Sequence, residues 1–275
     1  MTLLGFELVF RLLWGWLFFL MFISRSETSE RFPRVAIYIA TGFALFAGWL
    51  AHGGGALGPR VPATLALLVL GSVLYAFLTP RYARTVGFLT VIGAPWLIIA
   101  SRPLPDILNF FLSSFLLGSV FMGQYLGHWY LNAPGMHIRE LRRIVLAAVF
   151  SVGFKVAEAA WTLFVRIGLE PPLHVDVMGR PAPPSLGFQE LSIPDAVLGL
   201  SGDGAFGLGF YGLMMLAMRA LWGLLAPMLL VWMVKKTVDV RSTQSATGIL
   251  YALCVMILIG EGTAIFFWRN LGWNL

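Results

Sequence analysis

Charged residues are scarce in this sequence: Asp, Glu, Lys and Arg make up 12% of its 275 positions, whereas apolar residues make up 59%. A soluble domain usually carries about 25% charged residues, so this chain lacks the charge needed to cover a surface that faces water. The mean hydropathy of +0.83 agrees. The composition excludes a soluble protein and predicts an integral membrane protein, most of which lies in the lipid bilayer.

Cysteine and histidine are also rare. The single cysteine, Cys254, excludes a disulfide framework and any zinc or iron–sulfur site built from cysteines. A haem b site needs two histidines at similar depth on facing helices. The four histidines fall instead at opposite ends of predicted helices or in loops on opposite sides: His52, His128, His137 and His174. We therefore expect no metal, no covalently bound cofactor and no haem.

No motif identifies a reaction. The sequence contains no P-loop, nucleophile elbow or metalloprotease helix. Residues 202–207 match the letters of a dinucleotide-binding glycine fingerprint, but that motif needs a preceding strand in a βαβ unit, and here it leads into a membrane helix. We expect no catalytic residue. The net charge of +6 does not predict nucleic-acid binding, because basic residues collect in the cytoplasmic loops of membrane proteins.

Long apolar runs predict an all-α fold, a polytopic transmembrane bundle of about eight helices that forms one domain over residues 1–275. A helix needs roughly 20 apolar residues to cross the hydrocarbon core. Eight runs approach this length: 3–23, 34–52, 62–79, 85–101, 105–131, 143–168, 205–234 and 243–268. The runs 62–79 and 85–101 are short, and Pro95 interrupts the second, so we expect this pair to be tilted or one member to be re-entrant.

The distribution of basic residues predicts the orientation. Eleven lie in the loops after the first, third, fifth and seventh runs: Arg25, Arg31, Arg34, Arg81, Arg84, Arg139, Arg142, Arg143, Lys235, Lys236 and Arg241. Only four lie in the other loops and the termini: Arg60, Arg102, Arg180 and Arg269. The positive-inside rule then places the eleven in the cytoplasm and both termini outside. We expect a bacterial cytoplasmic membrane protein.

One loop is long enough for structure of its own. Residues 169–204 carry five acidic residues against the single Arg180. The alternation from His174 to Val177 predicts part of a short hairpin, and Ser192 followed by Pro194 is typical of a helix start. This extracytoplasmic loop could cap the bundle, dock another membrane or extracytoplasmic subunit, or serve as a plain connector.

Seven ionisable residues fall inside the predicted spans: Glu7, Arg11, Lys155, Glu158, Arg166, Arg219 and Glu261. Charges are costly in lipid, so each is expected to face the bundle interior and a partner. Helical periodicity places Lys155, Glu158, Thr162 and Arg166 on one stripe and Thr247, Tyr251, Cys254 and Glu261 on another. Glu7 and Arg11 form an i,i+4 pair. Gln124 and His128 add a polar group near the inner end.

These charges allow two interpretations. They could pair and pin the helices together, or they could form a proton path or a polar cavity for a quinone head group or another small ligand. Trp161 and Trp222 could line such a flat ligand, although packing is the simpler role. The candidate site residues are Lys155, Glu158, Arg219, Glu261, Arg166, Tyr251 and Thr162, with Gln124 and His128 as an inner relay.

Three functions follow. The first is a membrane subunit of a larger electron-transfer or proton-translocating complex, which offers a quinone pocket or a proton path without a redox cofactor of its own. The second is a stand-alone transporter or channel for protons, anions or a small solute. The third is a structural scaffold. The two halves of the sequence share no placement of charges or prolines, so the internal repeats common in transporters find no support here.

Overall fold

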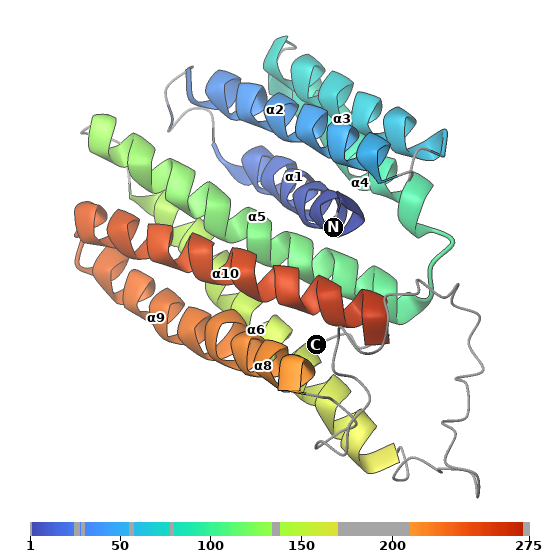
Figure 1. Ribbon diagram of the computed structural model, residues 1–275. Coiled ribbons are helices and arrows are strands. Elements are labelled where there is room, and N and C mark those ends of the chain that lie inside the picture. Colours follow the sequence, from blue (N-terminus) through green and yellow to red (C-terminus); the bar gives the residue numbers. More distant parts are fainter. Residues whose placement is uncertain are drawn as a thin grey trace, which may run out of the picture.

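The computed structural model describes residues 2–24, 28, 31–54, 58–77, 80–133, 138–169 and 210–271. Within these residues every regular element is a helix (Figure 1). The helices are α1 (Thr2–Phe22), α2 (Arg31–Gly53), α3 (Arg60–Phe77), α4 (Pro80–Ile99), α5 (Leu104–Asn132), α6 (Arg139–Leu169), α8 (Phe210–Met218), η2 (Arg219–Leu225), α9 (Ala226–Asp239) and α10 (Thr243–Leu271). Because α8, η2 and α9 are continuous, the chain forms the expected bundle of about eight helices.

Six of the described helices are long and apolar enough to cross a membrane. They are α1, α2, α5, α6, the α8–η2–α9 rod and α10. The remaining two, α3 and α4, contain shorter apolar stretches, Arg60–Tyr75 and Thr85–Ile99. These are the two runs predicted to be short, and α4 continues through Pro95. The protein is therefore an integral membrane protein with six long spans and one shorter helical pair.

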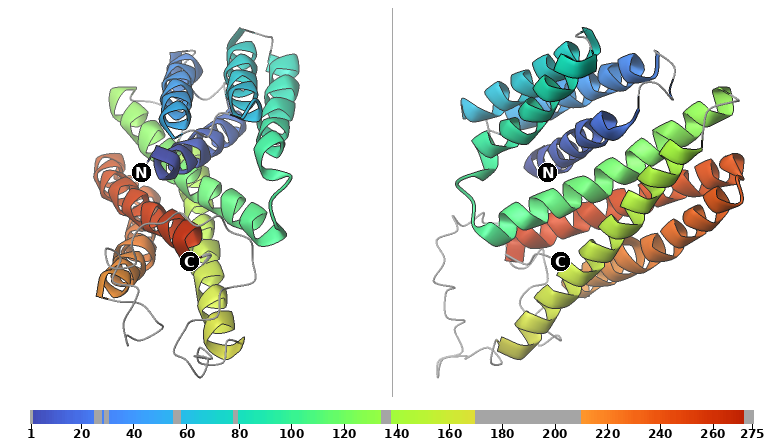
Figure 2. Two further views of the ribbon diagram at one scale, coloured as in Figure 1. Left: turned by 45° about the vertical axis from the view of Figure 1, so that its right-hand side comes forward. Right: turned by 180° about the vertical axis from the view of Figure 1, so that it is seen from behind.

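The helices are arranged in two four-helix units (Figure 2). In the first unit, α1 packs on α2, α2 on α3, α3 on α4, and α4 returns to α1. In the second unit, α5 packs on α6, α6 on α9, α9 on α10, and α10 returns to α5. Both halves thus share one cyclic order of neighbours, although their sequences show no repeat. Any four consecutive helices that pack in a ring have this order, so the predicted absence of an internal repeat stays a prediction.

The central helix is α1, which joins the units by packing on α5 and α10. It runs parallel to α5, as successive ring contacts show: Phe10 with Phe110, and Phe18 with Phe115. The two backbones cross at glycine. A Cβ atom on Gly118 would collide with the backbone of Gly15, and the reverse is also true. Small residues allow this close approach of membrane helices, so this crossing fixes how the units meet.

A seven-residue π-helix, η2, interrupts the α8–η2–α9 rod. The amide of Ala226 donates to the carbonyl of Leu221, five residues back. Pro227 follows directly, and proline cannot donate to the carbonyl four residues before it. The wider turn accommodates that loss, and Pro227 lies near the start of α9, directly after the π segment. The segment turns Arg219 and Gly223 inward, where both are buried.

The two ends of the bundle differ in charge. The end formed by the start of α6 and the end of α9 carries exposed basic residues and the ion pairs Arg142–Asp239 (3.5 Å) and Lys235–Asp239 (3.2 Å). The opposite end holds the starts of α1 and α5 and the end of α10 (Figure 1). The loop at 169–204, expected to hold a hairpin and a short helix, lies outside the described residues apart from Leu169.

Candidate functional site

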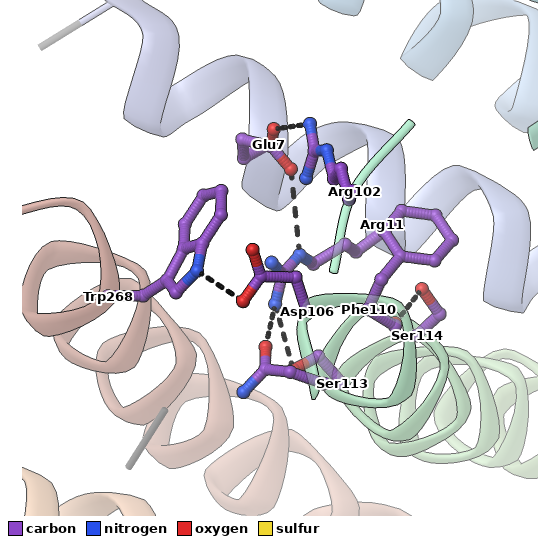
Figure 3. A network of polar contacts seen from close by, with 9 residues as sticks. Glu7, Arg11, Arg102, Asp106, Phe110, Ser113, Ser114 and Trp268 are labelled. Atoms are coloured by element: carbon purple, nitrogen blue, oxygen red, sulfur yellow. Dashed lines mark hydrogen bonds and ion pairs between the residues drawn. The ribbon is translucent and has the colours of Figure 1, made fainter. Parts of the chain in front are cut away.

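A buried ionic network begins on α1 (Figure 3). Arg102, from the turn before α5, donates from Nη2 to Oε1 of Glu7 at 2.6 Å. Arg11 lies one helical turn beyond Glu7, with 3.8 Å between its Nε and Oε2 of that carboxylate. The predicted i,i+4 pair is therefore present. Exposure falls along the series, from 20% for the Arg102 side chain to 9% for Glu7 and 1% for Arg11, so the network leads inward.

Arg11 connects α1 to α5. Its Nη1 donates to Oδ1 of Asn109 at 2.7 Å and to Oγ of Ser113 at 3.0 Å. The guanidinium also lies between the rings of Phe110 and Trp268, with 5.8 and 5.9 Å to their centroids. Cation–π contacts of this kind stabilise a desolvated cation. The arginine is thus held by two polar side chains and two aromatic faces.

At the outer edge of this network, Trp268 on α10 donates from its indole nitrogen to Oδ1 of Asp106 at 2.9 Å (Figure 3). The cation of Arg102 lies 5.3 Å from the same indole ring. Trp268 therefore links the end of α10 to the start of α5 and to the turn before it. This contact closes the ionic network at the end of the bundle.

A second ion pair lies between η2 and α10. Nη1 of Arg219 donates to Oε1 of Glu261 at 3.2 Å, and both side chains are buried, at 2% and 0% exposure. The helices approach closely beside this pair: a Cβ atom on Gly223 would lie 2.8 Å from the Cα atom of Gly260 and 2.9 Å from Nη1 of Arg219. The two glycines make the space that the guanidinium occupies.

A third ion pair lies on α6, where Nζ of Lys155 donates to Oε2 of Glu158 at 2.7 Å. Lys155 is 1% exposed and Glu158 is 14% exposed. Electrostatics joins the three pairs: Glu261 interacts with Lys155, Arg219 and Arg11. We call the set Arg102, Glu7, Arg11, Asn109, Ser113, Arg219, Glu261, Lys155 and Glu158 the polar column.

The polar column lies in one half of the bundle. At 1.5 Å per residue, Glu7 and Asn109 are about 8 Å from the starts of their helices. Arg11 and Ser113 are about 14 Å from them, and Glu261 is about 15 Å from the end of α10. These termini share one end of the bundle (Figure 1). The column therefore extends from that end to about mid-membrane.

Aromatic residues fill the other half between α1, α2 and α5. The ring of Tyr125 lies 4.8 Å from that of Phe32 and 5.2 Å from that of Trp16. The Tyr125 hydroxyl donates to the backbone carbonyl of Phe32 at 3.0 Å, and the Trp16 indole donates to that of Ala36 at 3.1 Å. We call Trp16, Phe32 and Tyr125 the aromatic plug. Its polar atoms bond to backbone, so they do not extend the column.

Other residues predicted for the site lie elsewhere. Tyr251 does not share the inner face of α10, because it is 50% exposed while Thr247, Cys254 and Glu261 are buried. Its 40° offset from Thr247 turns it past the edge of that face. Thr162 is partly exposed, one turn after Glu158. Arg166 lies in α6, but its side chain is not among those the structure describes.

Among the described residues, no hydrogen bond or ion pair joins Gln124 and His128, the predicted inner relay, to the polar column. Gln124 is partly buried, and His128 is exposed near the end of α5. Trp161 and Trp222 are 68% and 43% exposed, so both lie at the surface of the chain. Trp161 packs against Phe164, with 6.3 Å between the ring centroids. Among the described residues, no group of three His, Cys, Asp or Glu side chains could hold a metal ion.

The sequence did not identify five residues that lie in the ionic network around Arg11 or directly contact it. Arg102 was assigned to a loop, and the others were not singled out: Asp106, Asn109, Ser113 and Trp268. A signal existed on α5, because positions 106, 109 and 113 recur at steps of three and four and so fall on one helical face. No signal in the sequence predicts the contact of Arg102 with Glu7 on α1, because that contact depends on how the two units pack.

Several buried atoms of the Arg219–Glu261 pair remain without a hydrogen bond. Within the described part of the chain, Nε and Nη2 of Arg219 and Oε2 of Glu261 have no partner. Buried polar groups are nearly always bonded to protein or to ordered water, so these atoms are exceptions among the buried groups of the bundle.

The chain matches no protein-family model, no curated protein and no solved structure.

Proposed function

We propose that the polar column is a proton path through the outer half of the membrane. The observation that supports this is the inward series of buried ionisable groups, from Arg102 at 20% exposure through Glu7 to Glu261 at 0%. Ionisable residues at membrane depth typically mark ion or proton pathways. The carboxylates of Glu7, Glu261 and Glu158 are the groups that take up and release protons. Arg11, Arg102 and Arg219 position them through ion pairs.

We further propose that the chain does this as a membrane subunit of a larger electron-transfer or proton-translocating complex. Beyond Glu261 the inner face of α10 continues with Ile257, Cys254 and Leu253, all buried, so a complete crossing needs a partner to supply the rest of the path. A proton path is favoured over a quinone pocket because the charged side chains of the column bond to one another, at 2.6, 2.7 and 3.2 Å between the paired atoms. The acidic segment 169–204 is the proposed docking site for that partner. A quinone remains the cofactor to test in the complex.

The basic end of the bundle supports an orientation with that end in the cytoplasm of a bacterium. Arg142, Arg143, Lys235 and Lys236 lie there, opposite the polar column. Basic residues are enriched on the cytoplasmic side of membrane proteins. The proton path then opens to the outside, and both termini lie outside. Cysteine scanning with a membrane-impermeant label on intact cells tests this orientation.

The direct test is Glu158→Gln. The native complex is purified in mild detergent, and proton uptake is followed with a pH-sensitive dye in vesicles. Glu140→Gln is the matched control, because Glu140 also forms an i,i+3 ion pair on α6, with Arg143 at 2.9 Å, but at the basic end. Glu158→Gln should abolish proton transfer while the complex still assembles, and Glu140→Gln should preserve it. Normal transfer in Glu158→Gln, or its failure to assemble, would refute this role.

A second candidate, a stand-alone transporter for protons, anions or a small solute, is supported by the position of Arg11. This residue is 1% exposed and lies where the two units meet, and transporters often bind their substrate near mid-membrane, between two parts of the bundle. The mass of the native particle in mild detergent separates the candidates. A large assembly containing redox subunits supports the first. A particle of this chain alone supports the second, and solute flux in vesicles then becomes the assay. A structural scaffold would conduct nothing in either preparation.

A further inference from the structure

Positive charge gathers where α6 and α9 pack together, at the end where α6 begins and α9 ends (Figure 1). Residues 139–143 open α6, and residues 235–241 close α9 and form the turn after it. Together these two segments hold six basic side chains against two acidic ones. Clusters of basic residues beside a membrane helix attract anionic lipid head groups, so this end of the bundle has the charge for such a contact.

One carboxylate holds two of these cations side by side. Nε of Arg142 on α6 lies 3.5 Å from Oδ1 of Asp239. Nζ of Lys235 on α9 donates to Oδ2 of the same aspartate at 3.2 Å. A single carboxylate neutralises one cation, and the side chains of Arg142 and Lys235 are 54% and 43% exposed. The two helices therefore present one uncompensated positive charge to the membrane surface at the line where they meet.

Apolar surface continues from Arg142 along α6. Leu146 and Gly153 lie within about 40° of Arg142 around the helix axis, and both are exposed. A Cβ atom on Gly153 would have nothing within 4 Å, so there is open space beside this position. The rise from Arg142 to Gly153 is about 16 Å, close to the depth of one leaflet of the hydrocarbon core, about 15 Å. This edge of α6 thus has the length of one acyl chain.

The matching edge of α9 begins at Lys235. Trp232 and Met228 lie within about 60° of Lys235 around the axis, at 57% and 50% exposure. Nζ of Lys236 lies 5.7 Å from the centroid of the Trp232 ring, and tryptophan is typical of the head-group level of a membrane. Because Arg142 and Lys235 meet at Asp239, the two edges flank one line of contact. We call this strip the α6–α9 seam: Arg142, Leu146, Gly153, Lys235, Trp232 and Met228.

We propose that the α6–α9 seam binds one anionic phospholipid from the leaflet at the basic end of the bundle. The lipid phosphate lies against Arg142 and Lys235, and one acyl chain follows the apolar edges past Trp232 to Gly153. Charge complementarity selects an anionic head group, because a zwitterionic lipid brings a cation of its own to the same place. The site does not depend on the proton path: a chain that conducts no protons can still bind the lipid.

The test uses the full chain in detergent micelles and native mass spectrometry, which counts the lipids bound to each molecule. Phosphatidylglycerol and phosphatidylcholine with identical acyl chains are titrated at constant ionic strength. Each cation near an anionic lipid contributes about fivefold in affinity, so two cations should make phosphatidylglycerol bind about 25-fold more tightly, at one saturable site. Equal binding of the two lipids would overturn the proposal. So would displacement of the lipid by an equal concentration of glycerol 3-phosphate, because the acyl chain would then contribute nothing.

Arg142→Gln removes one cation of the seam and should weaken phosphatidylglycerol binding about fivefold. Arg34→Gln is the matched control, because Arg34 is exposed at the start of α2, at the same end of the bundle but in the other four-helix unit (Figure 1). It should leave the affinity unchanged. Equal weakening by the two variants would refute the site, because the lipid would then respond only to the total charge of that end.

Gly153→Leu tests the acyl chain without changing any charge. Leucine would fill the open space beside Gly153, and phosphatidylglycerol should bind more weakly. Gly248→Leu is its control, because Gly248 on α10 is also exposed and also has nothing within 4 Å of its Cβ atom, but lies outside the seam. Wild-type affinity in Gly153→Leu, or the same loss in Gly248→Leu, would contradict the placement of the acyl chain along α6 and α9.

Discussion

Glu261→Gln should destabilise the bundle more than any other single charge removal. Glutamine keeps the shape of the side chain but leaves Arg219, 1% exposed, with an uncompensated charge. At the observed separation of 3.2 Å and an effective dielectric constant near 20, the lost attraction is about 5 kcal/mol. Breaking a buried pair by removing one partner costs about 3–5 kcal/mol. We therefore expect the free energy of unfolding to fall by about that amount.

Removing both charges should cost far less. The double variant Arg219→Met with Glu261→Met leaves no unpaired charge between η2 and α10, and Lys155 keeps Glu158 as its partner at 2.7 Å. Replacement of a whole buried pair by apolar residues is often neutral, because the desolvation penalty disappears together with the attraction. We expect this variant to unfold within about 2 kcal/mol of the wild type.

The chain carries its own reporter for this measurement. Cys254, its only cysteine, is 7% exposed and packs against the backbone of Val120. A maleimide reagent should therefore label it in the unfolded chain and spare it in the folded one. The labelled fraction, followed through an SDS titration in mixed micelles, gives the free energy of unfolding for each variant.

Glu140→Gln is the control for that series. Its partner Arg143 is 60% exposed, so water screens the charge left behind, and the expected cost is below about 1 kcal/mol. A cost of less than about 1 kcal/mol for Glu261→Gln would refute the reasoning, because Arg219 would then not depend on Glu261 for its charge balance. So would a double variant less stable than Glu261→Gln alone.

Two further predictions concern packing, and the same Cys254 assay measures both. Gly118→Ala should lower the free energy of unfolding by more than about 3 kcal/mol, since its Cβ atom would collide with the Gly15 backbone. Gly153→Ala is the control and should leave that free energy unchanged, because nothing lies within 4 Å of its Cβ atom. Equal effects of the two variants would contradict the close crossing. Trp268→Phe keeps the ring beside the arginines but removes the 2.9 Å bond to Asp106, and should cost about 1.5 kcal/mol. No change would mean that this bond does not hold α10.

Local periodicity correctly predicted the helices and the i,i+4 pair of Glu7 and Arg11, and it placed Lys155 and Glu158 on one stripe without pairing them. Lipid offers no hydrogen bonds to the backbone, so every span must be helical, and apolar run length then locates the helices. The pairs Glu7–Arg11 and Lys155–Glu158 follow from spacings of four and three residues. Both are contacts within one helix, for which the sequence interval fixes the distance.

The contacts between helices could not be predicted in this way. Arg102 with Glu7 and Arg219 with Glu261 join residues 95 and 42 positions apart, and helix spacing alone does not say which helices meet. Helix spacing also failed to predict which way Tyr251 faces. A residue near the edge of a helical face points inward or outward after only a small rotation of the helix about its axis. The π segment η2 adds another, since a period of 3.6 residues does not apply across it.

The contact between the two units bears on the choice between a subunit and a transporter. In a transporter built from this chain alone, with its site where the units meet, the two units must move relative to each other. The units meet at α1 and α5, whose backbones touch at Gly15 and Gly118, and Trp16 and Tyr125 bridge the same two helices at 5.2 Å. Sliding at this crossing would bring Cβ-bearing residues into the space that only glycine fits. The geometry thus favours a rigid half-path completed by a partner, and a Gly15→Ala variant that folds and still moves solute would argue against it.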